Sequence, residues 1–238
     1  MMATGAATVA AREVKAKVLE IAAHMLEASP GDLQIENSVV SVKGVPTSGV
    51  PLAQIAMGAM LAPGLMPAGV DLKLEADTSY DGETGGWSSG SHACWVEIDP
   101  DTGKIEIKRY VVVEDCGTMI NPGVVDGQVF GAVAMGIGGM LLEHSAYGPD
   151  GQYVAATFMD YLMPSAPEIP EIEIDHLEYQ APTMIGPRGV GEGGTVIAPA
   201  ALMNAIDDAL RQVGGTRIEA TPVTPTRILE AMGVIPRE

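Results

Sequence analysis

The stretch HACWVEI-DPDTG-KIEIKRYVVVE, residues 92–114, decides the fold class. Apolar and polar residues alternate on both sides of the central DPDTG, and this alternation is typical of strands with one buried face. Asp, Pro and Gly in the centre have the composition of a tight turn. The sequence therefore predicts an antiparallel strand pair over residues 92–98 and 104–114.

Helical segments lie on both sides of this strand pair. Residues 6–27 carry apolar side chains three and four positions apart, and Asn121-Pro122 suits the start of a helix that runs to residue 142. Further helices are predicted over 51–60, 197–213 and 224–233, and further strands over 33–35, 39–42, 70–76, 152–158 and 171–179. Strands and helices follow no strict alternation. The sequence therefore predicts the α+β class, with mixed sheets and long packed helices.

We expect one domain over residues 1–238 with an internal division near residues 62–90. The stretch 62–90 is rich in Gly, Pro, Ser and Asp, and residues 79–90 within it are predicted to be a functional or partner-covered loop. Apolar residues make up 47% of the chain, which is enough for a sizeable core.

Charge and hydropathy exclude several classes of protein. The chain has 31 acidic and 13 basic residues and a formal net charge of −18, which argues against nucleic-acid binding because phosphates attract clustered Lys and Arg. The longest nearly apolar run, residues 129–142, is too short to span a bilayer and contains four glycines. We therefore expect a cytoplasmic protein without a membrane span.

Two cysteines, Cys94 and Cys116, are too few for a disulfide framework or an iron–sulfur cluster held by this chain alone. They also lack the C-x-x-C spacing of zinc and thioredoxin-like sites. No metal site with protein ligands is expected.

The predicted helix over 122–142 contains glycines at positions 127, 131, 136, 138 and 139. Each costs roughly 1 kcal/mol relative to Ala in a helix, so this number of glycines indicates a close approach to the backbone. Two interpretations remain open. Either another helix packs closely against these positions, or a ligand does.

The segment GPRGVGEGGT, residues 186–195, places one carboxylate, Glu192, among glycines and before a predicted helix. A ligand could reach this carboxylate unobstructed, and the helix N-terminus would favour its ionised form. An ionised carboxylate in a tight cleft is what a general base requires. A surface glutamate in an ordinary glycine-rich turn is the alternative interpretation. Neither the Rossmann nor the P-loop fingerprint is present.

Seven short motifs occur in order along the chain: GAA (5–7) with IAAH (21–24), EID (97–99) with TG (102–103), DCG (115–117) to NP (121–122), DGQ (126–128), GIG (136–138), MDY (159–161) with MP (163–164), and GVGEGG (189–194). In this order they resemble the C-terminal part of the molybdopterin-binding large subunit of molybdenum hydroxylases. This family includes xanthine dehydrogenase, aldehyde oxidase and aerobic carbon monoxide dehydrogenase. The resemblance covers nearly the whole chain. One departure is Arg188, where relatives often carry Lys.

The resemblance implies that Glu192 is the catalytic base toward the molybdenum-bound hydroxyl group. The cofactor-binding residues that it implies are Gln128, Gly191, Cys116, Asn121, Gly5, Ala6 and Ala7. The implied cofactor is molybdenum–molybdopterin in its cytosine dinucleotide form, shared with another chain. Iron–sulfur clusters and FAD are expected on partner subunits.

By the same resemblance, the chain is an oxidoreductase subunit or fragment that oxidises an aldehyde, an N-heterocycle or carbon monoxide with water-derived oxygen. The family pattern starts upstream of Met1, so the expected partners are the remainder of the large subunit and the iron–sulfur and flavin subunits. A non-catalytic scaffold or assembly subunit is the alternative. A stand-alone acid–base enzyme is a third hypothesis, which lacks a second catalytic group.

Overall fold

The computed structural model describes residues 2–82 and 86–237. The chain divides into two compact units, Met1–Gly82 and Glu83–Glu238. The loop predicted over residues 79–90 includes residues 83–85, which lie outside the described residues. Helices and strands are mixed in both units, which confirms the predicted α+β class.

The first unit contains one long helix, a small sheet and a short helix. Helix α1 (Met2–Met25) is followed by strands β1 (Leu33–Glu36), β2 (Val39–Val42) and β3 (Val45–Pro51), and then by α2 (Leu52–Leu61). The strands pair antiparallel in the order β1-β2-β3. Ile21 of α1, Val40 of β2 and Ile55 of α2 are fully buried together in the core of this unit.

The strand predicted over residues 70–76 is wrong, because this segment is extended but pairs with no other strand. Its alternation has another cause. Val70, Leu72 and Leu74 pack against the α1 core, and the Nζ of Lys17 on α1 donates hydrogen bonds to main-chain carbonyls at Lys73 (3.2 Å) and Glu75 (2.9 Å). An extended chain on a helix therefore shows the same period of two as a strand in a sheet.

The sheet of the second unit is mixed. Strands β4 (Ser89–Ile98) and β5 (Ile105–Asp115) pair antiparallel, and β6 (Ile172–Leu177) lies parallel to β5. The predicted turn between β4 and β5 is present: Gly103 N–H donates to the Asp99 carbonyl over 2.8 Å. Gly103 has φ of +71°, a left-handed conformation that favours glycine.

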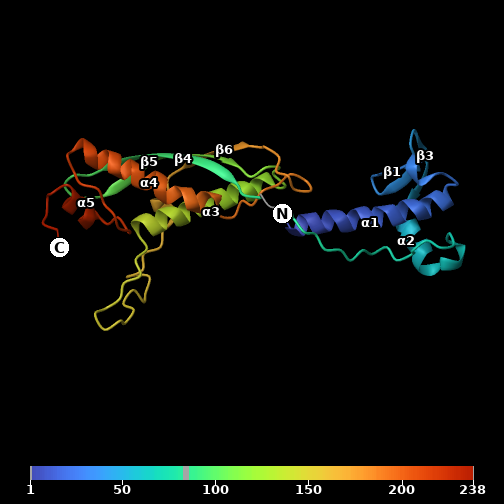
Figure 1. Ribbon diagram of the computed structural model, residues 1–238, viewed down its shortest axis with the longest axis horizontal. Coiled ribbons are helices and arrows are strands. Elements are labelled where there is room, and N and C mark those ends of the chain that lie inside the picture. The colour runs from blue at the N-terminus through green and yellow to red at the C-terminus, as the bar shows by residue number, and fades with distance from the viewer. Residues whose placement is uncertain (1, 83–85, 238) are drawn as a thin grey trace. The chain divides into compact units, whose positions relative to one another are not determined.

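Helices α3 (Pro122–Leu141) and α4 (Gly193–Gln212) lie side by side along one face of this sheet (Figure 1). The short helix α5 (Pro225–Ala231) closes the end of the unit's core. Tyr110 and Val112 of β5 contribute fully buried side chains from the sheet. The buried residues from the helices include Val129, Val133, Ile137, Leu202, Ile206 and Leu210.

The α3 glycines have two different roles. A Cβ at Gly136 would lie 2.6 Å from the Ala198 Cβ of α4, so this glycine permits close helix–helix contact. A Cβ at Gly138 would lie 2.5 Å from Oε1 of Glu143 and 2.9 Å from Cδ of Pro164, neither of which belongs to a helix. A Cβ placed on the remaining three glycines would have no heavy atom within 4 Å; these are Gly127, Gly131 and Gly139. The helix-contact interpretation is therefore correct for Gly136, Gly138 packs against non-helical chain, and the other three glycines face open space.

Helix α3 is long and apolar enough, by length and composition alone, to cross a membrane, and 44% of its most apolar window is buried inside this unit. Its buried side chains recur every three to four residues, at Val125, Val129, Val133, Ile137 and Met140. This spacing is that of a helix that packs one face into a protein core.

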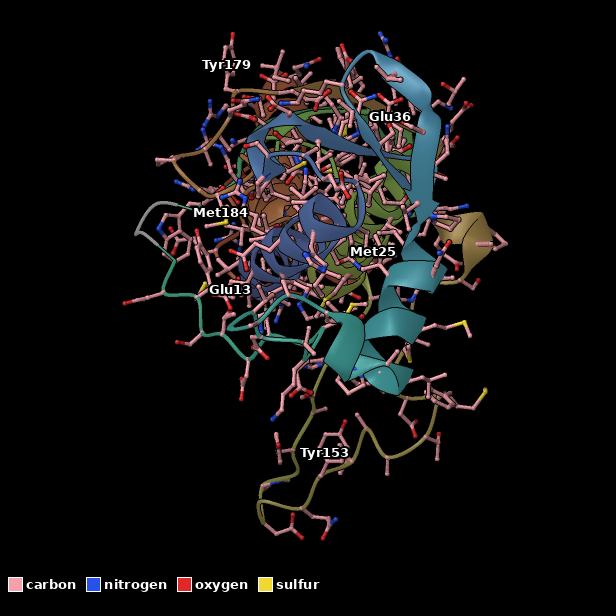
Figure 2. All side chains as sticks on the ribbon, turned by 90° about the vertical axis from the view of Figure 1, so that its right-hand side faces the viewer. Glu13, Met25, Glu36, Tyr153, Tyr179 and Met184 are labelled. Atoms are coloured by element: carbon pink, nitrogen blue, oxygen red, sulfur yellow. The ribbon has the colours of Figure 1, made fainter. Side chains whose placement is uncertain are left out.

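Residues 146–163 include a narrow excursion that extends away from the sheet and helices of the unit, and Figure 2 shows Tyr153 on it. A strand predicted over residues 152–158 is wrong: the segment forms one isolated bridge, between Tyr147 and Tyr153. Val154 N–H donates to the Ala146 carbonyl over 2.9 Å, and the pairing then ends. Without a third strand or a covering helix, so short a pairing does not extend into a sheet.

The two kinds of α3 glycine give a matched pair of substitutions. Gly136→Ala should lower the free energy of unfolding by about 1–3 kcal/mol, because the added methyl overlaps Ala198. Gly139→Ala points into open space and should raise this free energy by up to about 1 kcal/mol, through helix propensity. Chemical denaturation of the full chain measures both. Equal effects would contradict the close α3–α4 contact at Gly136.

Candidate functional site

The end of β5 meets the glycine-rich segment 186–195. Arg188 N–H donates to the Cys116 carbonyl over 2.6 Å, and Thr118 N–H donates to the Gly186 carbonyl over 3.0 Å. Gly117 pairs with Pro187 in an isolated bridge. The structure thus brings together two motifs that lie about seventy residues apart in the sequence.

A partly buried ion pair holds this junction. Asp115 accepts hydrogen bonds on Oδ1 from the N–H groups of Gly117 (2.9 Å) and Tyr179 (3.2 Å), and its Oδ2 lies 3.7 Å from Nε of Arg188. The Arg188 guanidinium also donates to the carbonyls of Trp87 and Tyr179, at 3.2 Å each. Charged groups with several hydrogen bonds in a half-dry setting are strongly oriented. The Asp115–Arg188 pair therefore sets the path of the chain into residues 189–192.

The glycines of the segment face in two directions. A Cβ placed on Gly191 would have no heavy atom within 4 Å. A Cβ placed on Gly189 would lie 3.5 Å from its nearest atom, the Gly86 carbonyl oxygen. By contrast, a Cβ at Gly194 would lie 2.8 Å from the Ala132 Cβ, and one at Gly193 would overlap Oε1 of Glu114. The segment therefore has one face open to a large ligand and one face closed by the protein itself.

Glu192 lies at the boundary between these two faces. It occupies the N-cap position of α4, where its carbonyl accepts from Val196 N–H over 3.1 Å and its side chain makes no capping hydrogen bond. The side chain is exposed. An exposed carboxylate beside an open stretch of main chain can accept a proton from a ligand that lies against that stretch.

The other residues expected in this unit have different surroundings. The Cys116 side chain is 3% exposed, and burial raises the pKa of its thiol, so it is an unreactive thiol pointing inward. Asn121 is exposed and caps α3, its Oδ1 accepting from Val124 N–H over 3.3 Å. Gln128 is exposed on α3, next to Val129, whose carbonyl approaches Gly194 of α4. The Gln128 side chain is therefore free to meet a ligand.

Gly5, Ala6 and Ala7 lie in the other compact unit, in the first turns of α1. Gly5 is buried, and a Cβ there would overlap the ring of Tyr80. Ala7 is exposed. Within that unit, a ligand would therefore approach residues 5–7 from the side of Ala7.

Sequence reasoning missed a buried acidic residue, Glu114, next to the glycine-rich segment. Its side chain is 1% exposed, and neither carboxyl oxygen has a hydrogen-bond partner among the described residues. Burial raises the pKa of Glu114, and attraction to His176 and the nearby Ser88 hydroxyl oppose this rise in part. A signal was present, because Glu114 follows Tyr110 and Val112 at strand spacing and so shares their buried face.

His176 and Asp126 form a second missed pair. Nε2 of His176 on β6 lies 2.7 Å from Oδ1 of Asp126 on α3, which connects the sheet edge to the helix. Across the described ranges 2–82 and 86–237, no group of three or more His, Cys, Asp or Glu could hold a metal ion.

Comparison with known proteins gives consistent matches. The model of the molybdopterin cofactor-binding domain family matches residues 1–170, a range that ends before Glu192. The large subunit of nicotine 6-hydroxylase from Paenarthrobacter nicotinovorans is 38% identical over 97% of this chain and 28% of its own length. Carbon monoxide dehydrogenase large chain from Afipia carboxidovorans is 37% identical over 86% of this chain and 25% of its own length.

Among solved structures, quinoline 2-oxidoreductase from Pseudomonas putida 86 superposes with a TM-score of 0.87 at 41% identity. That match covers 95% of this chain and 29% of the other. The chain thus spans less than a third of the length of each of these three proteins.

The raised pKa of Glu114 predicts a pH dependence of stability. Its folded pKa lies above the ordinary value of 4.5, so its contribution to stability is complete below that value and is lost as pH rises through the folded pKa. Glu114→Gln removes this loss, so the stability of the variant relative to the native sequence should increase as pH rises from 4.5 through the neutral range. Chemical denaturation of the full chain across this range measures the difference.

Glu106, exposed on the same strand, is the matched control. Its hydrogen bond to Lys108 lowers the pKa of Glu106, so its contribution is present above the ordinary value and is lost as pH falls through the lowered pKa. Glu106→Gln should therefore shift relative stability weakly and in the opposite direction. The same pH trend for both variants would contradict the burial of an unpaired Glu114.

Proposed function

The chain belongs to the molybdopterin cofactor-binding domain family, and we propose that it forms part of a molybdenum hydroxylase large subunit in which Glu192 is the general base. The observation that carries this proposal is the exposed Glu192 carboxylate beside the open face at Gly189 and Gly191. A large group can approach the main chain there without meeting a side chain. The residues present are therefore compatible with a bulky cofactor.

When bound, a molybdenum–molybdopterin cofactor would supply the oxidation–reduction chemistry. The residues of this chain would bind, orient and move a proton. A carboxylate oxygen of Glu192 accepts the proton of the group that becomes the nucleophile, and Gln128 donates or accepts hydrogen bonds along the cofactor. Gly191 leaves its main-chain groups accessible, and the Asp115–Arg188 pair holds the segment in place. We further propose the cytosine dinucleotide form of the cofactor.

Residues Cys116, Asn121, Gly5, Ala6 and Ala7 complete the proposed cofactor surface. Because the Cys116 side chain is buried, its contribution is its main chain. Asn121 contributes the amide nitrogen that its capping role leaves available. In α1, the exposed Ala7 is the part of residues 5–7 that a cofactor could contact, since Tyr80 covers Gly5.

The names of the relatives indicate small substrates. Nicotine and quinoline are N-heterocycles, and carbon monoxide is a third substrate named among them. We propose that the assembled enzyme oxidises an aldehyde, an N-heterocycle or carbon monoxide, with oxygen from water, in the cytoplasm. Its electrons would pass to iron–sulfur and FAD groups on partner subunits.

The partner that contacts this chain most extensively would be the remainder of the large subunit. Large apolar side chains are exposed at Met60 and Leu61 on α2 and at Phe158 and Met159 on the excursion, where Met159 is 86% exposed. The open glycines of α3 add a surface that another backbone can approach closely. Exposed large apolar side chains of this kind, taken within each unit, are typical of a protein interface.

A non-catalytic scaffold or assembly subunit is a second candidate, favoured by one observation. Two stretches proposed to contact the cofactor are partly closed, because Cys116 is buried and Tyr80 covers Gly5. Molybdenum and cytosine-dinucleotide pterin distinguish the two candidates. Both should be present in the native complex of a hydroxylase subunit and absent from that of a scaffold.

Glu192→Gln in the assembled native complex should lower kcat by at least about 100-fold, because the amide cannot accept the proton. Molybdenum content should stay near normal, since the open main-chain face at Gly191 is unchanged. Steady-state kinetics and metal analysis of the purified complex measure both quantities.

The matched control is Glu219→Gln, which removes an exposed carboxylate elsewhere in the same unit and should leave kcat unchanged. Full activity of Glu192→Gln at normal molybdenum content would reject Glu192 as the base.

A further inference from the structure

Glu114 lies against Gly193, the residue after Glu192, on the closed face of the glycine-rich segment. It is the second-to-last residue of β5, in register with Gly90 of β4 and His176 of β6. Its side chain shares the buried face of Tyr110 and Val112, which places it between the sheet and the helices. A carboxyl group is thereby held inside the unit, at the point where α4 begins.

The contact between Glu114 and Gly193 is close. A Cβ at Gly193 would overlap Oε1 of Glu114 and would lie 2.8 Å from its Cδ and 3.1 Å from the Ser88 hydroxyl oxygen. Gly193 is the first residue of α4 and directly follows Glu192. The Glu114 carboxyl therefore occupies the space that any side chain at Gly193 would need.

The start of α4 lacks a cap from its own N-cap side chain. The first N–H groups of a helix have no intrahelical acceptor, and an acidic group near them is favourable. Glu192, at the N-cap, makes no side-chain cap, and Glu114 brings a carboxyl group to this helix end from a neighbouring strand. This arrangement leaves the Glu192 carboxylate available for other chemistry.

His176 and Asp126 support Glu114 from the sheet edge. On parallel strands, residues in register project to the same side, so the His176 ring lies next to the Glu114 side chain. Its Nε2 is held by Asp126 at 2.7 Å, while its Nδ1 is buried and has no partner among the described residues. Burying a carboxyl group is unfavourable, and an apolar residue at this position would avoid that cost.

We propose that Glu114 is a positioning residue: its buried side chain, next to His176, packs against Gly193, fixes where the Glu192–Gly193 peptide lies and so directs the Glu192 carboxylate. The inference rests on the proposed role of Glu192 as the base. It explains why glycine stands at position 193, where the first helical residue must lie against a carboxyl group. It also gives a role to a buried acidic residue that contacts no expected ligand.

The first test compares Glu114→Gln with Glu114→Ala in the assembled native complex. Gln keeps the size of Glu and one carbonyl acceptor, so it should retain most of kcat. Ala leaves the peptide unsupported and should lower kcat by about 10- to 100-fold, with KM for the substrate changed less than about threefold. Glu106→Ala, exposed on the same strand, is the control and should leave both values unchanged.

Hydrogen exchange on the full chain provides a readout that does not depend on activity. Residues 186–197 should exchange at least about tenfold faster in Glu114→Ala than in the native sequence, and at near-native rates in Glu114→Gln. Glu114→Asp, one methylene shorter, should resemble Ala here, and it serves as the test if Glu114→Ala fails to fold. Equal exchange in Gln and Asp would overturn the inference.

A double substitution tests the contact itself. Gly193→Ala alone should lower kcat, because the new methyl displaces Glu114 and shifts Glu192. Added to Glu114→Ala, the same substitution should cause no further loss, because the space is then empty. An additive loss in the double variant would overturn the inference.

The two proposals fail in distinguishable ways. Native kcat and native exchange in Glu114→Ala, combined with an inactive Glu192→Gln, would overturn the positioning role alone. Native kcat in Glu192→Gln would reject the base itself. Faster exchange in Glu114→Ala would still identify Glu114 as the support of this peptide in that case, but not as a positioner of catalysis.

Discussion

The close contact between α3 and α4 is the constraint on which the second unit depends. It requires a glycine on each helix, Gly136 facing Ala198 and Gly194 facing Ala132, because a methyl group at either position would overlap the other helix. This contact sets α4 deep against the sheet, so its first residue meets the end of β5. The glycine-rich segment must then turn sharply over that strand end. The positions of Glu192 and of its neighbours follow from this packing.

The same segment separates two carboxyl groups by the direction in which each glycine faces. Gly189 and Gly191 leave one face open, beside the exposed Glu192. Gly193 closes the other face against the buried Glu114. Environment gives two chemically identical groups different properties, because burial raises the pKa of one while the other is accessible to a ligand. One short run of glycines thus serves both packing and proposed chemistry.

Local patterns predicted most elements correctly where the pattern had one physical cause. The pair β4 and β5, the parallel strand β6 and the helices α1, α3 and α4 were predicted within a few residues. Residues 70–76 were mispredicted because their alternation comes from packing on a helix rather than pairing in a sheet. Strand β3 was missed because Pro46, Ser48 and Gly49 weaken its strand pattern, and its pairing with β2 compensates.

The sequence by itself determined the α+β class, the family and the segment that carries the candidate base, because alternation, turn composition and motif order are local or additive signals. Tertiary structure alone decided which glycines face inward, that Asp115 pairs with Arg188, and that Glu114 lies against Gly193. Each of these facts joins residues far apart along the chain. Local composition does not indicate which distant residues meet, and these contacts form only when α3 and α4 pack on the sheet.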